Sequence, residues 1–416
     1  MLLYASDAMT SNPAEQHAAS ARTPWATVLL LGSLTAFAPM SIDMYLPSLP
    51  AIGADFHARP GAAQATLAAF FTGLAIGQFF YGPASDRWGR RAPLFGGVAL
   101  YTVASACCAL APSLETLIVA RFFQALGGCA GQVIARAVVR DRFDHRQSAR
   151  ILSQLMLVMG IAPIVAPIVG GALLTLGGWR VIFWILTGFG ALIGVWMFFA
   201  LGESRSMATA AQARGEHPLR AYWALLRQRT LVGYGLAGAL NSAALFAYIT
   251  ASPGLLILTY HIPAAHFGWV FGVNAIGLIG MSQVNAHLLH RHTPETILMR
   301  SRLASIAFAA VLALDAFTGW GGMWGVLVPL FFVMASFGLV GANTQAAGLN
   351  VDPLRAGSIS ALLGGVSFGA GALVAGLTGA LQDGTARPMA AVILISILAS
   401  SAALYGVARP QAGAAV

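Results

Sequence analysis

Charged side chains are scarce in this chain of 416 residues, where only 9% are Asp, Glu, Arg or Lys. Lysine is absent altogether, so all 23 basic residues are arginines. Hydrophobic residues make up 58% of the sequence, and the mean hydropathy is +0.75. A chain with so few charges cannot form the water-exposed surface of a soluble domain, because nearly all of it has to lie in lipid. The composition therefore predicts an integral membrane protein.

Sequence signals for enzyme chemistry are missing as well. The sequence has only three cysteines, which excludes a disulfide framework or a zinc pattern, and all three fall in apolar runs: Cys107, Cys108 and Cys129. There is no Walker loop, and no nucleophile stands with a base and an oxyanion donor. We expect no enzyme activity, no metal, no cofactor and no direct use of ATP.

Long apolar stretches fill the space between the few polar segments. A helix needs roughly 20 apolar residues to cross a membrane. Twelve stretches qualify, and they predict twelve spans in two sets of six: 25–47, 64–83, 93–111, 115–138, 151–176 and 181–201, then 231–258, 267–288, 303–317, 323–347, 359–381 and 389–407.

A polar segment separates the two sets of spans. Residues 203–229 contain acids, arginines and a histidine that interrupt the hydropathy. We therefore predict an N-terminal tail at 1–24, an N-terminal six-helix bundle at 25–202, a linker at 203–229, a C-terminal six-helix bundle at 230–408 and a tail at 409–416. The segment 287–302 occupies the same relative place in the second set as 82–91 does in the first, but it lacks the D-R-x-G-R core.

The arginines are distributed unevenly between the two sides of these spans. With the N-terminus on the inside, only Arg59, Arg180 and Arg387 fall outside, and Arg121 lies within a span. All the others fall inside, including Arg302, which directly precedes the predicted ninth span. Since inner loops of membrane proteins collect arginine, both termini are predicted to be cytoplasmic, in a bacterial inner membrane. The net charge of +9 follows from this sidedness and does not indicate nucleic-acid binding.

Residues 82–91 form the most informative polar segment, with the spacing G-x-x-x-D-R-x-G-R-R. One acid and three arginines cannot lie in hydrocarbon, so we predict a loop between the second and third spans. The residues of interest, together with an acid just beyond the fourth span, are Gly82, Asp86, Arg87, Gly89, Arg90, Arg91 and Asp141.

Only Asp43 and Arg121 place a charge well inside a span. Asp43 lies roughly 6 Å below the outer end of its span and Arg121 roughly 9 Å below, at 1.5 Å per residue. An intramembrane charge is costly and marks a functional site by default. We hypothesise that the two are paired, directly or through water, in the outer half of a central cavity. The alternative is a static salt bridge that only orients the spans.

Small residues and prolines recur in the fifth span, at Gly160, Pro163, Pro167, Gly170 and Gly171. Small residues let helices approach closely, and prolines bend them, which suits a helix that moves against its partners. Other residues combine apolar bulk with hydrogen-bonding groups, as a drug cavity requires. The predicted substrate contacts are Asp43, Gln124, Met159, Asn241, Phe246 and Tyr248.

Several of these segments resemble a known family. Residues 82–91 are similar to the signature of the major facilitator superfamily. The resemblance implies that its acid, here Asp86, faces the N-terminus of span eleven near Gly357 and so latches the cytoplasmic side. Residues 41–50, S-I-D-M-Y-L-P-S-L-P, resemble the first span of its Bcr/CflA drug-resistance branch. Arg121 with Gln124 is similar to the R-x-x-Q-G motif of span four, and residues 160–171 are similar to the antiporter motif of span five.

The resemblance implies an all-α membrane fold of 12 transmembrane helices in two pseudo-symmetric bundles of six. Members of this branch are drug:proton antiporters, so Asp43 and Arg121 are expected to couple proton movement to transport. We predict proton-driven export of small amphipathic antibiotics of the phenicol, bicyclomycin or sulfonamide type by alternating access. The expected partners are the drug, protons and the lipid bilayer, with no nucleic acid, and the expected state is a monomer.

Two other functions remain open at this point. One is a proton-coupled symporter or exporter of a specific metabolite on the same fold. The other is a membrane sensor or assembly factor that transports nothing. The small-residue pattern of the fifth span speaks against an importer, and the intramembrane charges speak against a protein without transport.

Overall fold

A computed structural model describes residues 25–205, 218–352 and 355–408. Both predicted tails lie outside these ranges, and so do residues 206–217 of the predicted linker. Within them, twelve helices are long and apolar enough to cross a membrane. The all-α fold expected from the sequence is confirmed, since the described residues contain helices and no strand.

The first spanning helix is compound, whereas the next five are continuous. It consists of α2 (Trp25–Asp43), the short helix η1 (Leu46–Ser48) and α3 (Leu49–Asp55). After η2 (Ala62–Gln64) the remaining members of the N-terminal set are α4 (Ala65–Trp88), α5 (Arg91–Ala109), α6 (Leu114–Arg142), α7 (His145–Gly177) and α8 (Trp179–Ala200).

A short helix, α10 (Pro218–Leu226), precedes the second set of spans. The C-terminal set consists of α11 (Arg229–Pro253) with its continuation η3 (Gly254–Thr259), α12 (Ala264–Leu288), α13 (Pro294–Thr318), α14 (Gly322–Leu349), α15 (Ala356–Ala380), and α16 (Arg387–Ala403) with its continuation η5 (Leu404–Ala408).

Local sequence signals explain where several of these helices begin. Ser113 caps α6, Asp144 caps α7 and Thr293 caps α13, each by accepting a hydrogen bond from the backbone N–H three residues later. Pro294 occupies the first position of α13, where its missing N–H costs nothing. Many large apolar side chains remain exposed, as lipid-facing residues must; Phe199 is 82% exposed.

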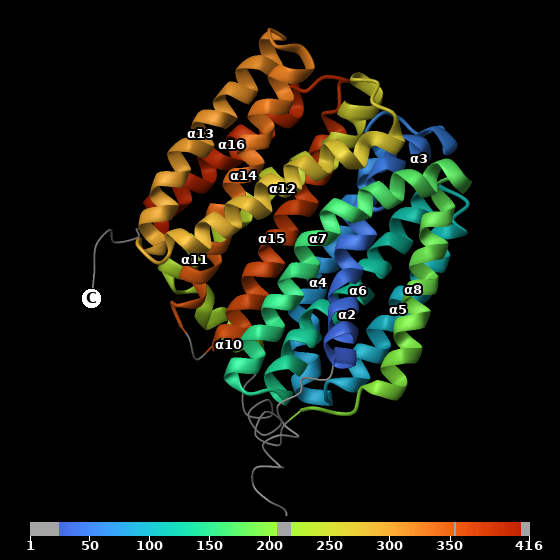
Figure 1. Ribbon diagram of the computed structural model, residues 1–416, viewed down its shortest axis with the longest axis vertical. Coiled ribbons are helices and arrows are strands. Elements are labelled where there is room, and N and C mark those ends of the chain that lie inside the picture. The colour runs from blue at the N-terminus through green and yellow to red at the C-terminus, as the bar shows by residue number, and fades with distance from the viewer. Residues whose placement is uncertain (1–24, 206–217, 353–354, 409–416) are drawn as a thin grey trace, which may run out of the picture.

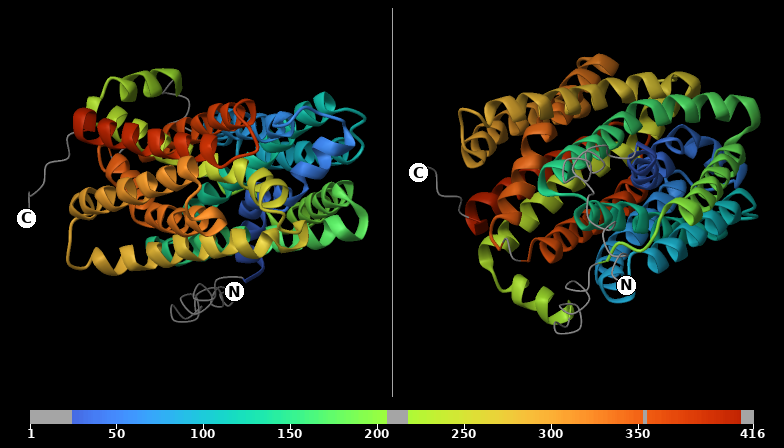
Figure 2. Two further views of the ribbon diagram at one scale, coloured as in Figure 1. Left: turned by 90° about the horizontal axis from the view of Figure 1, so that it is seen from above. Right: turned by 60° about the horizontal axis from the view of Figure 1, so that its bottom comes forward.

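The two sets of helices lie side by side (Figure 1). The N-terminal set, blue to green, is on the right, and the C-terminal set, yellow-green to red, is on the left; Figure 2 shows the same division from other directions. Two helix pairs, α4 with α15 and α7 with α12, make the most extensive contacts between the sets.

The two ends of the bundle differ. We call the end that carries Asp86, Arg90 and Asp141 the Arg90 end, and the end that carries Asp55, Trp179 and Arg180 the Trp179 end. In Figure 1, α7 and α12 meet at the Trp179 end and diverge toward the Arg90 end.

Direct contacts join the sets at the Trp179 end. The Gln64 side chain donates a hydrogen bond to Gln382 at 2.6 Å, and the backbones of Gly61 and Gly379 are so close that no side chain fits between them. The path between the sets is therefore closed at the Trp179 end.

Two boundaries differ from those expected. The segment 82–91 is mostly not a loop, because α4 continues to Trp88 and only Gly89 and Arg90 separate it from α5. The ninth span starts at Pro294 instead of residue 303, because Thr293 and Pro294 start the helix earlier than hydropathy indicates. Arg302 thus lies inside α13 and is fully buried, and its assignment to an inner loop was wrong.

Candidate functional site

Arg121 lies on α6 inside the N-terminal set and is fully buried. Its Nη1 donates a hydrogen bond to Gln124 Oε1 at 2.6 Å. Its guanidinium carbon lies 4.1 Å from the ring centre of Phe70, 4.5 Å from that of Tyr45 and 5.7 Å from that of Phe183. Aromatic faces attract a cation. The charge is therefore held by three rings and an amide.

Gln124 uses its carboxamide entirely within the N-terminal set. Its oxygen accepts from Arg121, and its nitrogen donates to Ser105 Oγ at 2.8 Å. The side chain is fully buried. Gln124 therefore positions Arg121, and the structure does not place it on the path between the two sets, where a substrate contact was expected.

Asp43 is the only buried acidic side chain among the described residues, with 4% of its surface exposed. It ends α2, just before the turn that leads to η1. Across the contact between the sets it lies within electrostatic reach of the Tyr248 hydroxyl on α11. Within the described part of the chain, no residue forms an ion pair or hydrogen bond with it.

The expected direct pair of Asp43 and Arg121 is absent from this structure. Tyr45, two residues after Asp43, places its ring on Arg121 and its hydroxyl 2.6 Å from Thr66 Oγ1. Side chains two residues apart on a helical turn point in nearly opposite directions. Since Tyr45 faces Arg121 in the interior of the N-terminal set, Asp43 points away from Arg121. Similar depth was not sufficient for contact, because depth does not determine direction around the helix.

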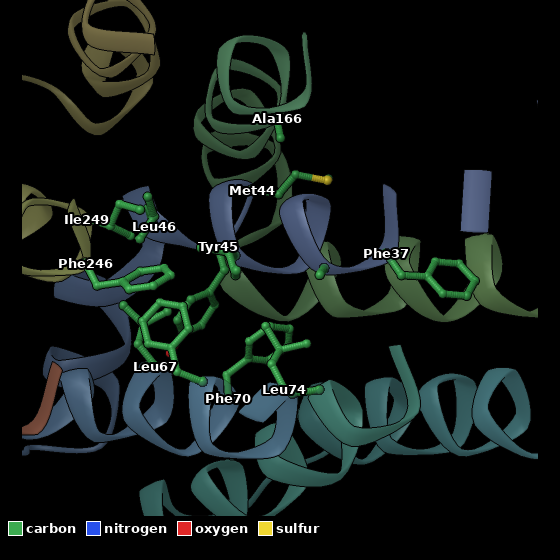
Figure 3. Close-up of a cluster of buried hydrophobic side chains, with 14 of the residues drawn as sticks. Phe37, Met44, Tyr45, Leu46, Leu67, Phe70, Leu74, Ala166, Phe246 and Ile249 are labelled. Carbon is green, nitrogen blue, oxygen red and sulfur yellow. The ribbon is translucent and has the colours of Figure 1, made fainter. Parts of the chain in front are cut away.

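Aromatic and apolar side chains close the path next to Asp43. Figure 3 shows Tyr45 and Phe70 between the ribbons of α2 and α4, with Phe246 reaching them from α11. The Phe246 ring lies 4.3 Å from that of Phe71 on α4, which belongs to the other set. Two predicted substrate contacts, Phe246 and Tyr248, thus lie where the sets meet.

Tyr248 is also held by a residue that sequence reasoning missed. Asn274 on α12 donates a hydrogen bond from Nδ2 to the Tyr248 hydroxyl at 3.0 Å, and the Tyr248 ring stacks on Phe271 at 5.2 Å. Asn274 is buried, and its Oδ1 has no partner among the described residues. The sequence did contain a signal for Asn274, because it is a polar amide inside an otherwise apolar span.

Asn241, another predicted substrate contact, lies on α11 and is 6% exposed. Its Oδ1 accepts a hydrogen bond from Arg302 Nη1 at 3.3 Å. Arg302 escaped sequence reasoning because it was assigned to a loop. Met159 is partly exposed on α7.

The small residues of α7 pack directly against other helices. A Cβ on Gly170 would meet the backbone carbonyl of Met44, and one on Gly171 would lie 2.8 Å from that of Ala264 on α12. A Cβ on Gly160 would make ordinary contact with Ile279 at 3.7 Å. Pro163 and Pro167 lie within the continuous helix α7. At these glycines α7 therefore packs closely both against the residue that follows α2 and against α12 of the opposite set.

The signature segment forms a charged cluster at the Arg90 end. The buried Arg90 side chain donates to Asp141 Oδ2 at 2.7 Å, to Ser85 Oγ at 2.8 Å and to Asp86. Asp141 was expected in this cluster. Arg90 thus links the end of α4 to the end of α6.

Glu203, just after α8, completes this cluster and was not predicted. Its carboxylate accepts the backbone N–H groups of Arg90 at 2.8 Å and Arg91 at 3.2 Å, next to the start of α5. Burial alone would raise the pKa of Glu203. The hydrogen bonds from the backbone N–H groups of Arg205, Arg90, Arg91 and Ser204 lower the pKa by more than burial raises it, so the net pKa lies below its usual value. Gly89 has a positive φ of 92°, and a Cβ there would collide with the Glu203 carboxylate.

The remaining signature residues have separate surroundings. The backbone carbonyls of Asp86 and Arg87 accept from Arg205, and the Arg91 guanidinium donates to the Phe198 carbonyl at 3.1 Å. Gly82 has open space around it. Asp86 forms no hydrogen bond to the described residues of α15, so the expected contact near Gly357 is absent here. Across the described ranges, no cluster of His, Cys, Asp and Glu side chains could hold a metal.

Comparison with known proteins agrees with this architecture. The model of the Major Facilitator Superfamily matches residues 31–376. The chain is 33% identical over 393 residues to the uncharacterized MFS-type transporter YdgK of Bacillus subtilis, covering 93% of this chain and 96% of that one. It is 30% identical over 376 residues to a bicyclomycin resistance protein homolog of Haemophilus influenzae, covering 89% and 94%.

Further relatives and solved structures support the same assignment. The multidrug resistance protein MdtL of Klebsiella pneumoniae is 29% identical over 326 residues, covering 78% of this chain and 81% of that one. A D-xylose-proton symporter has a TM-score of 0.70 at 14% identity, covering 91% and 95%, and shows the fold alone. These proteins are transporters and not enzymes. The chain belongs to the Major Facilitator Superfamily, and its resemblance to the Bcr/CflA type is confirmed.

Proposed function

We propose that this protein exports small amphipathic antibiotics, of the phenicol, bicyclomycin or sulfonamide type, in exchange for protons. The observation that carries the proposal is the position of Asp43: a buried acid, without an ion pair among the described residues, at the end of α2 and within electrostatic reach of Tyr248 on α11. The names of the bicyclomycin and multidrug resistance relatives support the substrate class. We assign no cofactor, because the proton gradient supplies the energy.

Burial of Asp43 links its proton to the closing of the Trp179 end. An ionised carboxylate without a partner is costly in an apolar site, whereas its protonated form is not. Closure around Asp43 therefore favours the protonated carboxyl. When the proton leaves toward the Arg90 end, the charge left behind favours opening of the Trp179 end. A proton arriving from outside then favours drug release and renewed closure.

The proposed orientation places the Arg90 end in the cytoplasm. Arginines gather at this end, as cytoplasmic loops of membrane proteins require. Both termini are then cytoplasmic, in a bacterial inner membrane, and the protein acts as a monomer. The bundles 25–202 and 230–408, joined by 203–229, are the two bodies that rock against each other around the substrate.

Replacing Asp43 tests the function directly. Wild type expressed in an efflux-deficient bacterium should raise resistance to at least one compound of the three classes, and Asp43→Asn should abolish that gain. In proteoliposomes, drug addition should move protons through wild type and not through the variant. Asp383→Asn, which changes an exposed acid outside the spans, is the matched control and should behave as wild type.

The same vesicles distinguish export from uptake. Export of drug against an inward proton gradient supports the proposal. Accumulation of substrate in the direction of proton entry would instead identify a metabolite symporter. Normal resistance in Asp43→Asn, with intact membrane insertion, would overturn proton coupling at this residue.

A further inference from the structure

Arg302 is a second fully buried arginine inside a helix that could span the membrane, in the opposite half from Arg121. It lies two helical turns into α13, is fully buried, and forms no ion pair within the described ranges. Its Nε is buried and has no hydrogen-bond partner there. Arginine keeps its charge in proteins, and a charge inside a membrane is costly enough to mark a functional position.

The Arg302 guanidinium holds one turn of α11. Nη1 donates to Asn241 Oδ1 at 3.3 Å, and Nη2 donates to Ser400 Oγ on α16 at 2.7 Å. The Ser400 hydroxyl in turn donates to the carbonyl of Ala237, four residues before Asn241. The guanidinium thus reaches the same turn directly and through serine.

These contacts determine which way the Asn241 carboxamide points. A guanidinium can only donate, so the oxygen of Asn241 must face it. Turning the amide over would bring its N–H groups against the donors of Arg302 and leave the charge with one acceptor. Arg302 therefore leaves Asn241 with two N–H donors that face away. The Asn241 nitrogen has no partner among the described residues, and the residue remains 6% exposed.

The position of Asn241 on α11 indicates what those donors face. Tyr248 lies seven residues later, which is two turns along nearly the same helix face. Tyr248 reaches across to Asn274 and Phe271 on α12 and lies within electrostatic reach of Asp43 of the other set, so we take this face to border the path between the sets. Asn241 lies two turns nearer the Arg90 end, toward which α7 and α12 diverge (Figure 1).

We propose that Arg302 is a positioning residue that fixes Asn241 as a hydrogen-bond donor toward the substrate path. The ligand class that fits is an uncharged molecule with an acceptor oxygen, such as a carbonyl, nitro or sulfonyl oxygen. This inference rests on the proposed export function, since it assumes that substrate passes between the two sets. Arg302 itself touches no substrate and acts through Asn241.

Transport kinetics with chloramphenicol, which carries nitro and carbonyl oxygens, test the inference in proteoliposomes. Asn241→Asp keeps a partner for Arg302 but removes both donors, and should raise KM about tenfold with kcat unchanged, as expected for a lost hydrogen bond. Arg302→Met should raise KM severalfold when it is the only substitution. In the Asn241→Leu background it should leave KM unchanged, because no amide remains to be oriented.

The design separates positioning from simple stabilisation. A purely structural role of Arg302 would lower the melting temperature and the amount of active protein without changing KM. If Arg302→Met does not fold, Asn241→Asp decides alone, and an unchanged KM there overturns the inference. If wild type moves no chloramphenicol and no other acceptor-bearing drug, the export function and this inference both fail; wild-type transport with unchanged KM in every variant overturns only the inference.

Discussion

At the scale of single residues, three buried charges on the spanning helices form no ion pair with one another, unlike Arg90, which is paired with Asp86 and Asp141. Asp43 is buried at the end of α2 without a partner among the described residues, Arg121 is enclosed by aromatic rings, and Arg302 is held by an amide and a hydroxyl. A buried ion pair would lower the energy of each charge but would also fix its protonation state. Without an ion pair to fix its charge, Asp43 could carry the proton exchange that we propose for it. The arginines then serve as fixed groups that organise their own bundles.

Glu203 allows a prediction on pH dependence outside the membrane. Its pKa is depressed in the folded protein by backbone N–H donors, so its contribution to stability is complete above its ordinary pKa of about 4.3 and is lost as pH falls through the lower folded value. Wild type should melt at lower temperature as the pH is lowered through this range. Glu203→Gln should melt lower at neutral pH and show a shallower decline.

Thermal unfolding in detergent between about pH 3 and pH 7 measures this effect. The control is Asp144→Asn, because Asn also serves as a helix cap and leaves the Arg90 cluster intact. Equal pH profiles for wild type and Glu203→Gln would show that the Glu203 charge does not stabilise the start of α5.

At the scale of elements, close approach between helices depends on particular glycines. Gly170→Ala should destabilise the protein by about 1–3 kcal/mol and slow transport, because the added Cβ would push α7 away from the carbonyl of Met44, which directly follows α2. Gly160→Ala on the same helix is the matched control, since its Cβ would make only ordinary contact with Ile279. Melting temperature and transport rate, measured on both variants, test the difference; equal behaviour of the two would contradict it.

An element or contact could be predicted from the sequence where a single local signal, such as hydropathy or motif spacing, was sufficient to determine it. Hydropathy was sufficient for the spans, and the 82–91 spacing was sufficient to bring Arg90 and Asp141 into one set of candidates.

Other features were missed because a second signal was overlooked or was not local. The start of α13 was missed because hydropathy was followed and the cap at Thr293 with Pro294 was not, so Arg302 was assigned to a loop outside the span. The direct contact between Asp43 and Arg121 is absent here, because sequence gives depth in a membrane but not the direction of a side chain at a helix end. Glu203 and Arg90 are 113 positions apart in the sequence, and no local pattern predicts that they are in contact.

At the scale of the whole molecule, the structure is closed at one end only. The Gln64–Gln382 bond and the approach of Gly61 to Gly379 hold the two sets together at the Trp179 end, whereas α7 and α12 diverge toward the Arg90 end. Asp86 has no hydrogen bond to the described part of α15. Alternating access requires that these two conditions reverse.

Cross-linking tests that requirement. In a variant with Cys107, Cys108 and Cys129 replaced by alanine, Gln64→Cys with Gln382→Cys should react with a short bifunctional thiol reagent, because the two native side chains are in hydrogen-bond contact. The linked protein should lose transport and regain it when a cleavable link is reduced. Asp55→Cys with Arg180→Cys is the control: these residues also pair, at 2.8 Å, but both belong to the N-terminal set. Linking them should leave transport intact. Transport that continues with Gln64→Cys and Gln382→Cys linked would mean that the Trp179 end does not have to open, and alternating access through this end would be wrong.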